Sequence, residues 1–135
     1  MSNEPELNTT ATATLIVGPN HLASSISSET GDEFPPVLAT ARMIALMEVA
    51  ASRVLVPLLG PGELSVGVTV DINHTAPTPL GAEVTATARY AGREGKLFLF
   101  EVSCADKGGE VGRGCHKRAI VSSERLQSGA ARRAG

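Results

Sequence analysis

The stretch FPPVLATARMIALMEVAASRVLVPLLGPGELSVGVTVDINHTAPTPLG, residues 34–81, contains a helix signal followed directly by a strand signal. Apolar residues recur every three or four positions from about residue 40 to 59, which predicts an α-helix. Pro35-Pro36 and Gly60-Pro61-Gly62 bound this segment, as expected for residues that interrupt helices. Because apolar residues also occupy the opposite side, we expect most of the helix surface to be buried.

The sequence after Gly62 alternates with a period of two, which predicts a strand over residues 65–75. One face carries mainly aliphatic side chains, so we expect it to meet the helix. His74 lies at the end of this apolar face and is therefore expected to point inward. The aliphatic face holds Val66, Val68, Val70, Ile72 and His74, and the opposite face holds Gly67, Thr69, Asp71 and Asn73.

Four further strands are predicted, one before the helix and three after it, with hairpin-length turns between the last three. One helix and five strands indicate an α+β fold in which an antiparallel sheet wraps around one long central helix, the hot-dog fold. An α+β roll of another topology would have the same order of elements. The free edge of such a sheet favours pairing with a second copy, so we expect a homodimer. The four strands are expected at 9–17, 82–91, 97–105 and 111–121.

The 135 residues suffice for one domain, which we place at 9–125 between flexible segments at 1–8 and 126–135. A net charge of −2 and the absence of tryptophan argue against a nucleic-acid partner. The chain has neither an apolar run of membrane-spanning length nor a signal sequence, so we expect a cytoplasmic protein without a membrane partner. Cys104 and Cys115 lack the spacing of a metal site.

Glu48 is a candidate catalytic residue because it lies in the middle of the apolar helix. None of its neighbours three or four positions away is a lysine or arginine, so its carboxylate either faces solvent or pairs with a distant group. An inward-facing His74 could be that group, since a carboxylate that orients an imidazole forms a general base. A structural or solvated role for His74 is the alternative. Asp71 and His74 should face opposite ways, which argues against a metal site in this strand.

Thr40 stands at the start of the helix, where hydroxyl residues commonly cap the free backbone N–H groups. Its hydroxyl could instead bind an acyl carbonyl beside those N–H groups. Eight residues separate Thr40 from Glu48, roughly 12 Å along a helix, so the two cannot touch within one helix. If both serve one site, a second subunit supplies one of them.

Residues 34–81 resemble the fluoroacetyl-CoA thioesterases and their hot-dog relatives, and the similarity extends over about residues 9–125. It includes the threonine before the helix, the L-M-E of the helix and the H-T-A-x-T-P-x-G segment, here HTAPTPLG from residue 74. It also includes the family's G-x-G-x-H-x-R-A, here GRGCHKRA at residues 112–119. The resemblance implies a catalytic set of Thr40, Glu48 and His74.

The resemblance further implies that the backbone of Gly67 lines the acyl pocket, that Phe34 gates it and that Arg118 lies near the active site. The chain differs from the family in the rest of the lid, the segment at residues 18–33 that covers the pocket. Where the family's fluoroacetyl enzyme has apolar lid residues, this sequence has His21, Ser24 and Gly31.

The predicted activity is hydrolysis of a short-chain acyl-CoA to the free acid and CoA, with no cofactor because coenzyme A is part of the substrate. The Glu48 carboxylate could act as nucleophile or as base for water, and the sequence leaves both open. A non-catalytic acyl-CoA or small-ligand binding protein on the same fold is the alternative. A hydratase is disfavoured, since the D-x-x-x-x-H pattern of hot-dog hydratases is absent. Candidate contacts for the CoA phosphates are Arg42, Arg53, Lys117 and Arg118.

Overall fold

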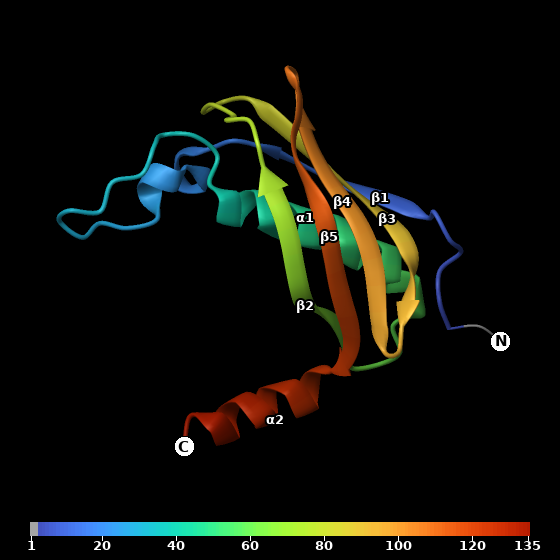
Figure 1. The fold of residues 1–135 in the computed structure, drawn as a ribbon. Helices are drawn as coiled ribbons and strands as arrows, with labels where there is room; N and C mark the ends of the chain where they lie inside the picture. The colour runs from blue at the N-terminus through green and yellow to red at the C-terminus, as the bar shows by residue number, and fades with distance from the viewer. Residues whose placement is uncertain (1–2) are drawn as a thin grey trace.

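A computed structural model describes residues 3–135 and has the expected α+β architecture, a curled antiparallel sheet wrapped around one long helix (Figure 1). The five strands lie in the order β1-β3-β4-β5-β2, so β1 and β2 form the edges of the sheet. The elements are β1 (Thr10–Ile16), α1 (Thr40–Leu55), β2 (Glu63–His74), β3 (Glu83–Glu94), β4 (Leu97–Asp106), β5 (Gly109–Ser122) and α2 (Ser123–Arg133).

Helix α1 ends four residues earlier than its apolar pattern, and Val56–Leu58 continues as a 3-10 turn at Pro57. The sheet covers only part of the helix surface. Val49 and Val56 remain 41% and 57% exposed, so the expectation that most sides are buried is wrong on that side. The side that meets the sheet is buried completely or nearly so, and it consists of Met43, Leu46, Met47, Ala50, Ala51, Val54 and Leu55.

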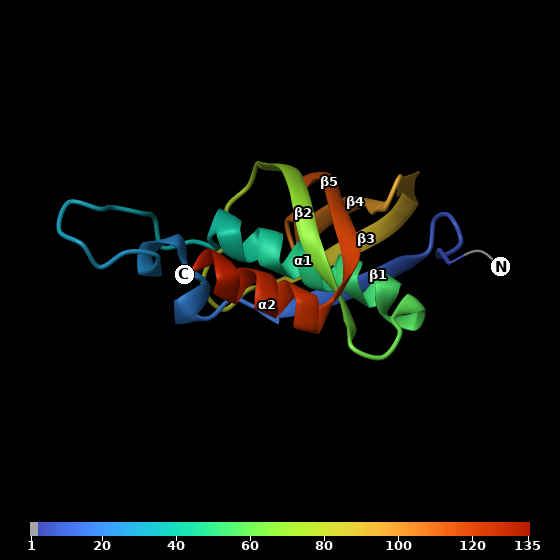
Figure 2. The same cartoon turned by 90° about the horizontal axis from the view of Figure 1, so that it is seen from below.

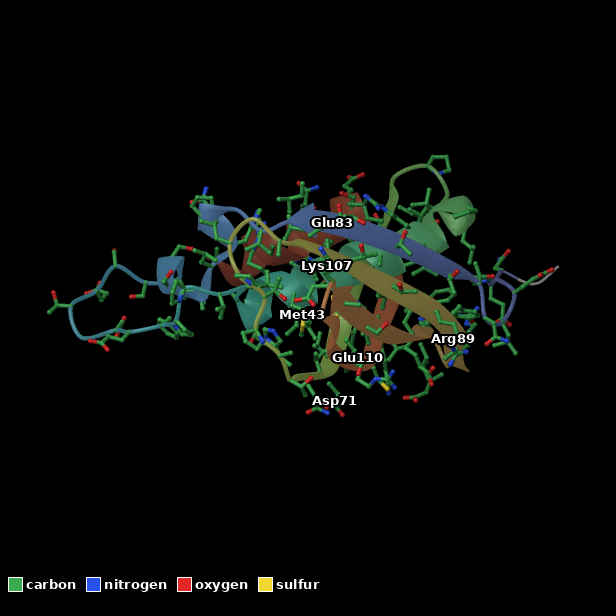
Figure 3. The ribbon with its side chains drawn as sticks, turned by 90° about the horizontal axis from the view of Figure 1, so that it is seen from above. Met43, Asp71, Glu83, Arg89, Lys107 and Glu110 are labelled. Carbon is green, nitrogen blue, oxygen red and sulfur yellow. The ribbon has the colours of Figure 1, made fainter. Side chains whose placement is uncertain are left out.

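A β-bulge in β2 changes which residues face the helix. The register with β5 pairs Gly67 with Arg118 and Thr69 with Lys117, which leaves Val68 without a partner. The inserted residue reverses the alternation, so Gly67 and not Val68 lies on the helix side, and Val68 is 50% exposed. The alternation expected for 65–75 is therefore correct after the bulge and wrong before it. Asp71, beyond the bulge, is exposed and points away from α1 (Figure 3).

Residues 126–135, expected to lack regular structure, lie mostly in α2, which projects from the end of β5 (Figure 2). The side chain of Ser122 caps this helix by accepting a hydrogen bond from the backbone N–H of Arg125 at 3.2 Å. None of the α2 residues is buried. At the other end, residues 3–8 precede β1, and the Glu4 carboxylate accepts a hydrogen bond from the buried Tyr90 hydroxyl at 2.5 Å. The flexibility of both terminal segments stays a prediction.

No helix within residues 3–135 has the length and hydrophobicity to cross a membrane. Over the same range, no three His, Cys, Asp or Glu side chains come together as metal ligands.

Strands β2 and β5 pack so closely that Gly114 has no room for a side chain. A Cβ atom at this position would overlap the backbone carbonyl oxygen of Asp71 on β2. We predict that Gly114→Ala lowers the free energy of unfolding by about 1–3 kcal/mol, because backbone must move to admit the methyl group. Gly129→Ala, in the exposed helix α2, is the matched control and should leave stability equal or higher. Urea unfolding followed by circular dichroism measures both, and equal stability of the two variants would contradict the prediction.

Candidate active site

Thr40 and His74 meet where the start of α1 lies against the end of β2. The Thr40 Oγ1 atom lies 2.8 Å from Nδ1 of His74, a hydrogen bond between residues 34 positions apart. Ala39, not Thr40, is the N-cap residue of α1, and no side chain caps this helix end. The local interpretation of Thr40 as a helix cap is therefore wrong, and its hydroxyl is free to hold the imidazole.

Two unfilled polar features lie beside this pair. The first is the helix start, where the N–H groups of Arg42 and Met43 bond to the Ala39 carbonyl, but those of Thr40 and Ala41 have no acceptor within residues 3–135. The second is Nε2 of His74, which is buried and has no hydrogen-bond partner in the same range. A buried polar atom left unpaired costs about 1–3 kcal/mol, so this nitrogen is suited to a ligand or a second chain.

An open pocket of about 440 Å³ lies in front of the Thr40–His74 pair. Its walls are predominantly apolar, with Phe34 and Ile26 on the lid side, 46% and 56% exposed. Such a pocket suits a small acyl group whose polar end reaches Thr40 and His74. The complete lining is Ala23, Ile26, Phe34, Pro35, Val37, Leu38, Thr40, Ala41, His74, Thr75, Ala76 and Pro77.

Backbone hydrogen bonds hold the walls of the pocket together. The Leu38 N–H donates to the Thr78 carbonyl at 2.8 Å, and the Ala39 N–H donates to the His21 carbonyl at 2.9 Å. Thr78 is fully buried, and its hydroxyl donates to the Asp106 carboxylate at 2.8 Å. These bonds join the lid, the start of α1 and the loop after His74 into one unit.

Glu48 belongs to a second cluster, two turns further along α1. Its Oε2 atom accepts a hydrogen bond from Nη1 of Arg118 at 3.0 Å. The Arg118 side chain is 6% exposed and that of Glu48 is 40% exposed, so this ion pair is buried on one side only. A Cβ atom on Gly67 would lie 2.9 Å from Glu48 Oε2, which explains the glycine at this position of β2.

His116 completes this cluster, although no role was predicted for it beyond its place in the G-x-G-x-H-x-R-A motif. It is 1% exposed, its Nδ1 lies 2.8 Å from the Thr69 carbonyl, and its Nε2 lies 3.1 Å from Nη1 of Arg118. Burial lowers the pKa of His116 below its usual value, and the positive charge of Arg118 lowers it further. The two-residue spacing between His116 and Arg118 on one strand was the available signal.

The six predicted site residues thus form two groups in one chain. Phe34, Thr40 and His74 surround the pocket, whereas Glu48, Gly67 and Arg118 lie together at the middle of α1. Within the part of the chain that the structure describes, Glu48 is hydrogen-bonded to Arg118 and not to His74, so the Glu48–His74 pair stays a prediction.

Three of the four candidate CoA contacts are engaged elsewhere. Arg53 donates to the Thr12 carbonyl, Lys117 pairs with Glu94, and Arg118 is buried. Arg42 is exposed and has no ion-pair partner among residues 3–135, which leaves it as the best placed of the four.

Comparison with known proteins identifies the family. Residues 17–124 match the model of the family described as fluoroacetyl-CoA-specific thioesterase (FlK). The fluoroacetyl-CoA thioesterase of Streptantibioticus cattleyicolor is 43% identical over 96 residues, which are 71% of this chain and 69% of that protein.

Solved structures agree with this result. A threonine-to-alanine variant of the fluoroacetyl-CoA thioesterase FlK, in complex with fluoroacetate, has a TM-score of 0.89 and 34% identity, covering 95% of this chain and 98% of its own. A hot-dog-like protein from Thermanaerovibrio acidaminovorans has a TM-score of 0.82 and 25% identity, covering 96% and 93%. The chain therefore belongs to the fluoroacetyl-CoA-specific thioesterase family, within the hot-dog thioesterases.

Proposed function

We propose that the protein hydrolyses a short-chain acyl-CoA thioester to the free acid and CoA. The observation that carries this proposal is the Thr40–His74 pair with its unpartnered Nε2, set at a helix N-terminus in a small apolar pocket. In the net reaction, the carbon–sulfur bond breaks and water supplies the new oxygen of the acid, whether water attacks directly or hydrolyses an acyl-enzyme anhydride. The sulfur leaves as the thiolate of CoA and takes up a proton, so that water is divided between the acid and the thiol.

Each group has a role suited to its surroundings. The Thr40 hydroxyl and the free N–H groups at the start of α1 stabilise the negative charge that develops on the carbonyl oxygen. His74 transfers the proton to or from the reacting atoms. Glu48 activates the attack, either as the base that deprotonates water or as the nucleophile. Its Oε1 atom acts in this step, because Oε2 accepts the hydrogen bond from Arg118. Phe34 and Gly67 line the acyl site, as the family resemblance implies.

A homodimer brings the two clusters into one site in this proposal. Strand β2 is a free edge with unpaired backbone groups, and an apolar surface beside it remains uncovered in one chain. Glu48 lies next to this surface and is only partly buried, which suits a carboxylate that serves the Thr40–His74 pair of a second copy. The exposed apolar residues are Val49 and Val56 on α1 and Val70 on the helix side of β2.

Loss of the imidazole tests the proposed chemistry. We predict that His74→Ala lowers kcat/KM for acetyl-CoA and fluoroacetyl-CoA by about 10²–10⁴-fold, the usual effect of a positioned acid–base group. Glu48→Gln should have a loss of similar size, and both variants should remain folded. Release of free CoA from purified protein measures the rate. A wild-type protein that binds these thioesters without cleaving them would establish the binding-protein alternative.

Subunit exchange tests the shared site. We predict that a 1:1 mixture of Glu48→Gln and His74→Ala, exchanged through partial unfolding and refolding, regains about a quarter of wild-type activity. The reason is that half of the dimers are mixed, and each mixed dimer has one site with both groups intact. Each variant taken through the same procedure alone is the control. No recovery in a mixture shown by mass spectrometry to contain mixed dimers would place both groups in one chain.

The composition of the lid sets the expected selectivity. Between residues 18 and 33 the only large apolar side chains are Leu22 and Ile26, and Ile26 is 56% exposed. Each large apolar side chain absent from the lid forgoes roughly 1.5–3 kcal/mol of burial. We therefore predict a modest preference for fluoroacetyl-CoA over acetyl-CoA, measured as the ratio of kcat/KM. A ratio above roughly 10⁴ would mean that discrimination lies outside the lid.

A further inference from the structure

We infer that His116 is a positioning residue that holds the Glu48 carboxylate in place through Arg118. The inference rests on the proposed function for the role of Glu48, and on geometry for the rest. No hydrogen bond joins His116 to Glu48. The two hydrogen-bond partners of His116 are Thr69, 47 residues away along the chain, and Arg118, two residues away.

The partners of His116 determine its protonation. The Thr69 carbonyl oxygen can only accept a hydrogen bond, so Nδ1 of His116 carries the proton. Arg118 Nη1 can only donate, so Nε2 of His116 must be the acceptor. Both contacts are satisfied together only by the neutral imidazole protonated on Nδ1. The lowered pKa of His116 agrees with this assignment.

Arg118 is held on three sides. Its Nε donates to Ser65 Oγ at 3.0 Å and its Nη2 to the Ser65 carbonyl at 2.9 Å. The two protons of Nη1 are divided between His116 Nε2 and Glu48 Oε2. The acceptor on His116, together with the two bonds to Ser65, therefore fixes the orientation in which the second Nη1 proton points at Glu48. Without it, one buried N–H of Nη1 would be unpaired, which favours a shift of Arg118 that weakens its bond to Glu48.

The surroundings of His116 offer no substitute for this acceptor. The charged groups that face it are Arg118 from β5 and Glu48 from α1, and β2 contributes the Thr69 carbonyl. From β4, the ring of Phe100 lies 6.5 Å from the imidazole, centroid to centroid. Protonation of Nε2 would turn an N–H toward the Arg118 N–H groups and place two positive charges side by side, so the arrangement requires a neutral His116.

Two substitutions separate hydrogen bonding from packing. His116→Phe keeps a ring of similar size and removes both hydrogen bonds, whereas His116→Gln keeps one donor and one acceptor. We expect His116→Phe to lower kcat for acetyl-CoA by about 100-fold with little change in KM, because a displaced catalytic group slows the reaction rather than binding. His116→Gln should recover most of kcat. Thermal unfolding of each variant shows whether it is folded under assay conditions.

A double-mutant cycle tests whether the effect passes through Glu48. His116→Phe should cause no further loss in a Glu48→Gln background, since the carboxylate that it positions is already absent. In a Thr40→Ala background it should cause its full loss. An equal loss in all three backgrounds would show that His116 affects activity through general stability and would overturn the inference.

A measurement without substrate distinguishes this inference from the proposed function. Arginine guanidinium N–H resonances in ¹⁵N–¹H spectra report whether Arg118 is held, whatever the protein hydrolyses. We expect slowly exchanging Arg118 signals in the wild type and in His116→Gln, and their loss in His116→Phe. Unchanged signals in a folded His116→Phe would overturn the inference, whereas absent turnover with the expected spectra would refute only the proposed function.

Discussion

The contact between α1 and the concave face of the sheet is the constraint on which the remaining structure depends. A helix that is apolar on most sides is unstable in water, and burying each large side chain contributes roughly 1.5–3 kcal/mol. The sheet meets this need by curling around the helix, with Met43, Met47 and Leu55 almost completely buried beneath it. The curl places His74 at the end of β2 and Gly67 near its middle beside α1, so polar groups come together at two levels of the helix.

The tight fit of helix and sheet also explains where small residues occur. Gly67 lies where the Glu48 carboxylate and the His116 ring approach β2, and Gly112 lies where the Met43 side chain approaches β5. A side chain at either position would push these groups apart. The same closeness gives Arg118 a dry environment in which its hydrogen bonds are strong, because little water competes for them. The close packing of helix and sheet therefore determines both the positions of the glycines and the geometry of the site.

The polar groups on α1 and β2 divide into two clusters within one chain. Thr40 and His74 lie together at the pocket, but the Glu48 carboxylate is directed to Arg118 at a different level of α1. The helical rise separates Thr40 from Glu48 by roughly 12 Å, so no side-chain rotation can join them. Val49, next to Glu48 in the sequence of α1, is also exposed, so the part of the helix that the sheet leaves uncovered adjoins Glu48.

The sequence by itself determined α1, the five strands and the identity of the candidate polar residues. These features depend on repeats of 3.6 and 2 residues and on local proline and glycine signals, all of which are visible within a short window. The family resemblance correctly indicated the thioesterase family from the motifs at residues 74–81 and 112–119. Helix α2 was missed because its residues are mostly polar and none is buried, although Ser122 caps it and Glu124 and Arg132 suit the charges of its two ends.

Tertiary structure alone decided which polar groups meet. The bulge at Val68 arises from the pairing of β2 with β5, and it reversed the face assigned to Gly67. Arg118 and Glu48 are 70 residues apart, and His116 found its carbonyl partner 47 residues away. Such contacts depend on strand register and on the curl of the sheet, which no local pattern encodes. Chemistry-bearing residue types can be read along the chain, but their partners are set by how separate elements pack.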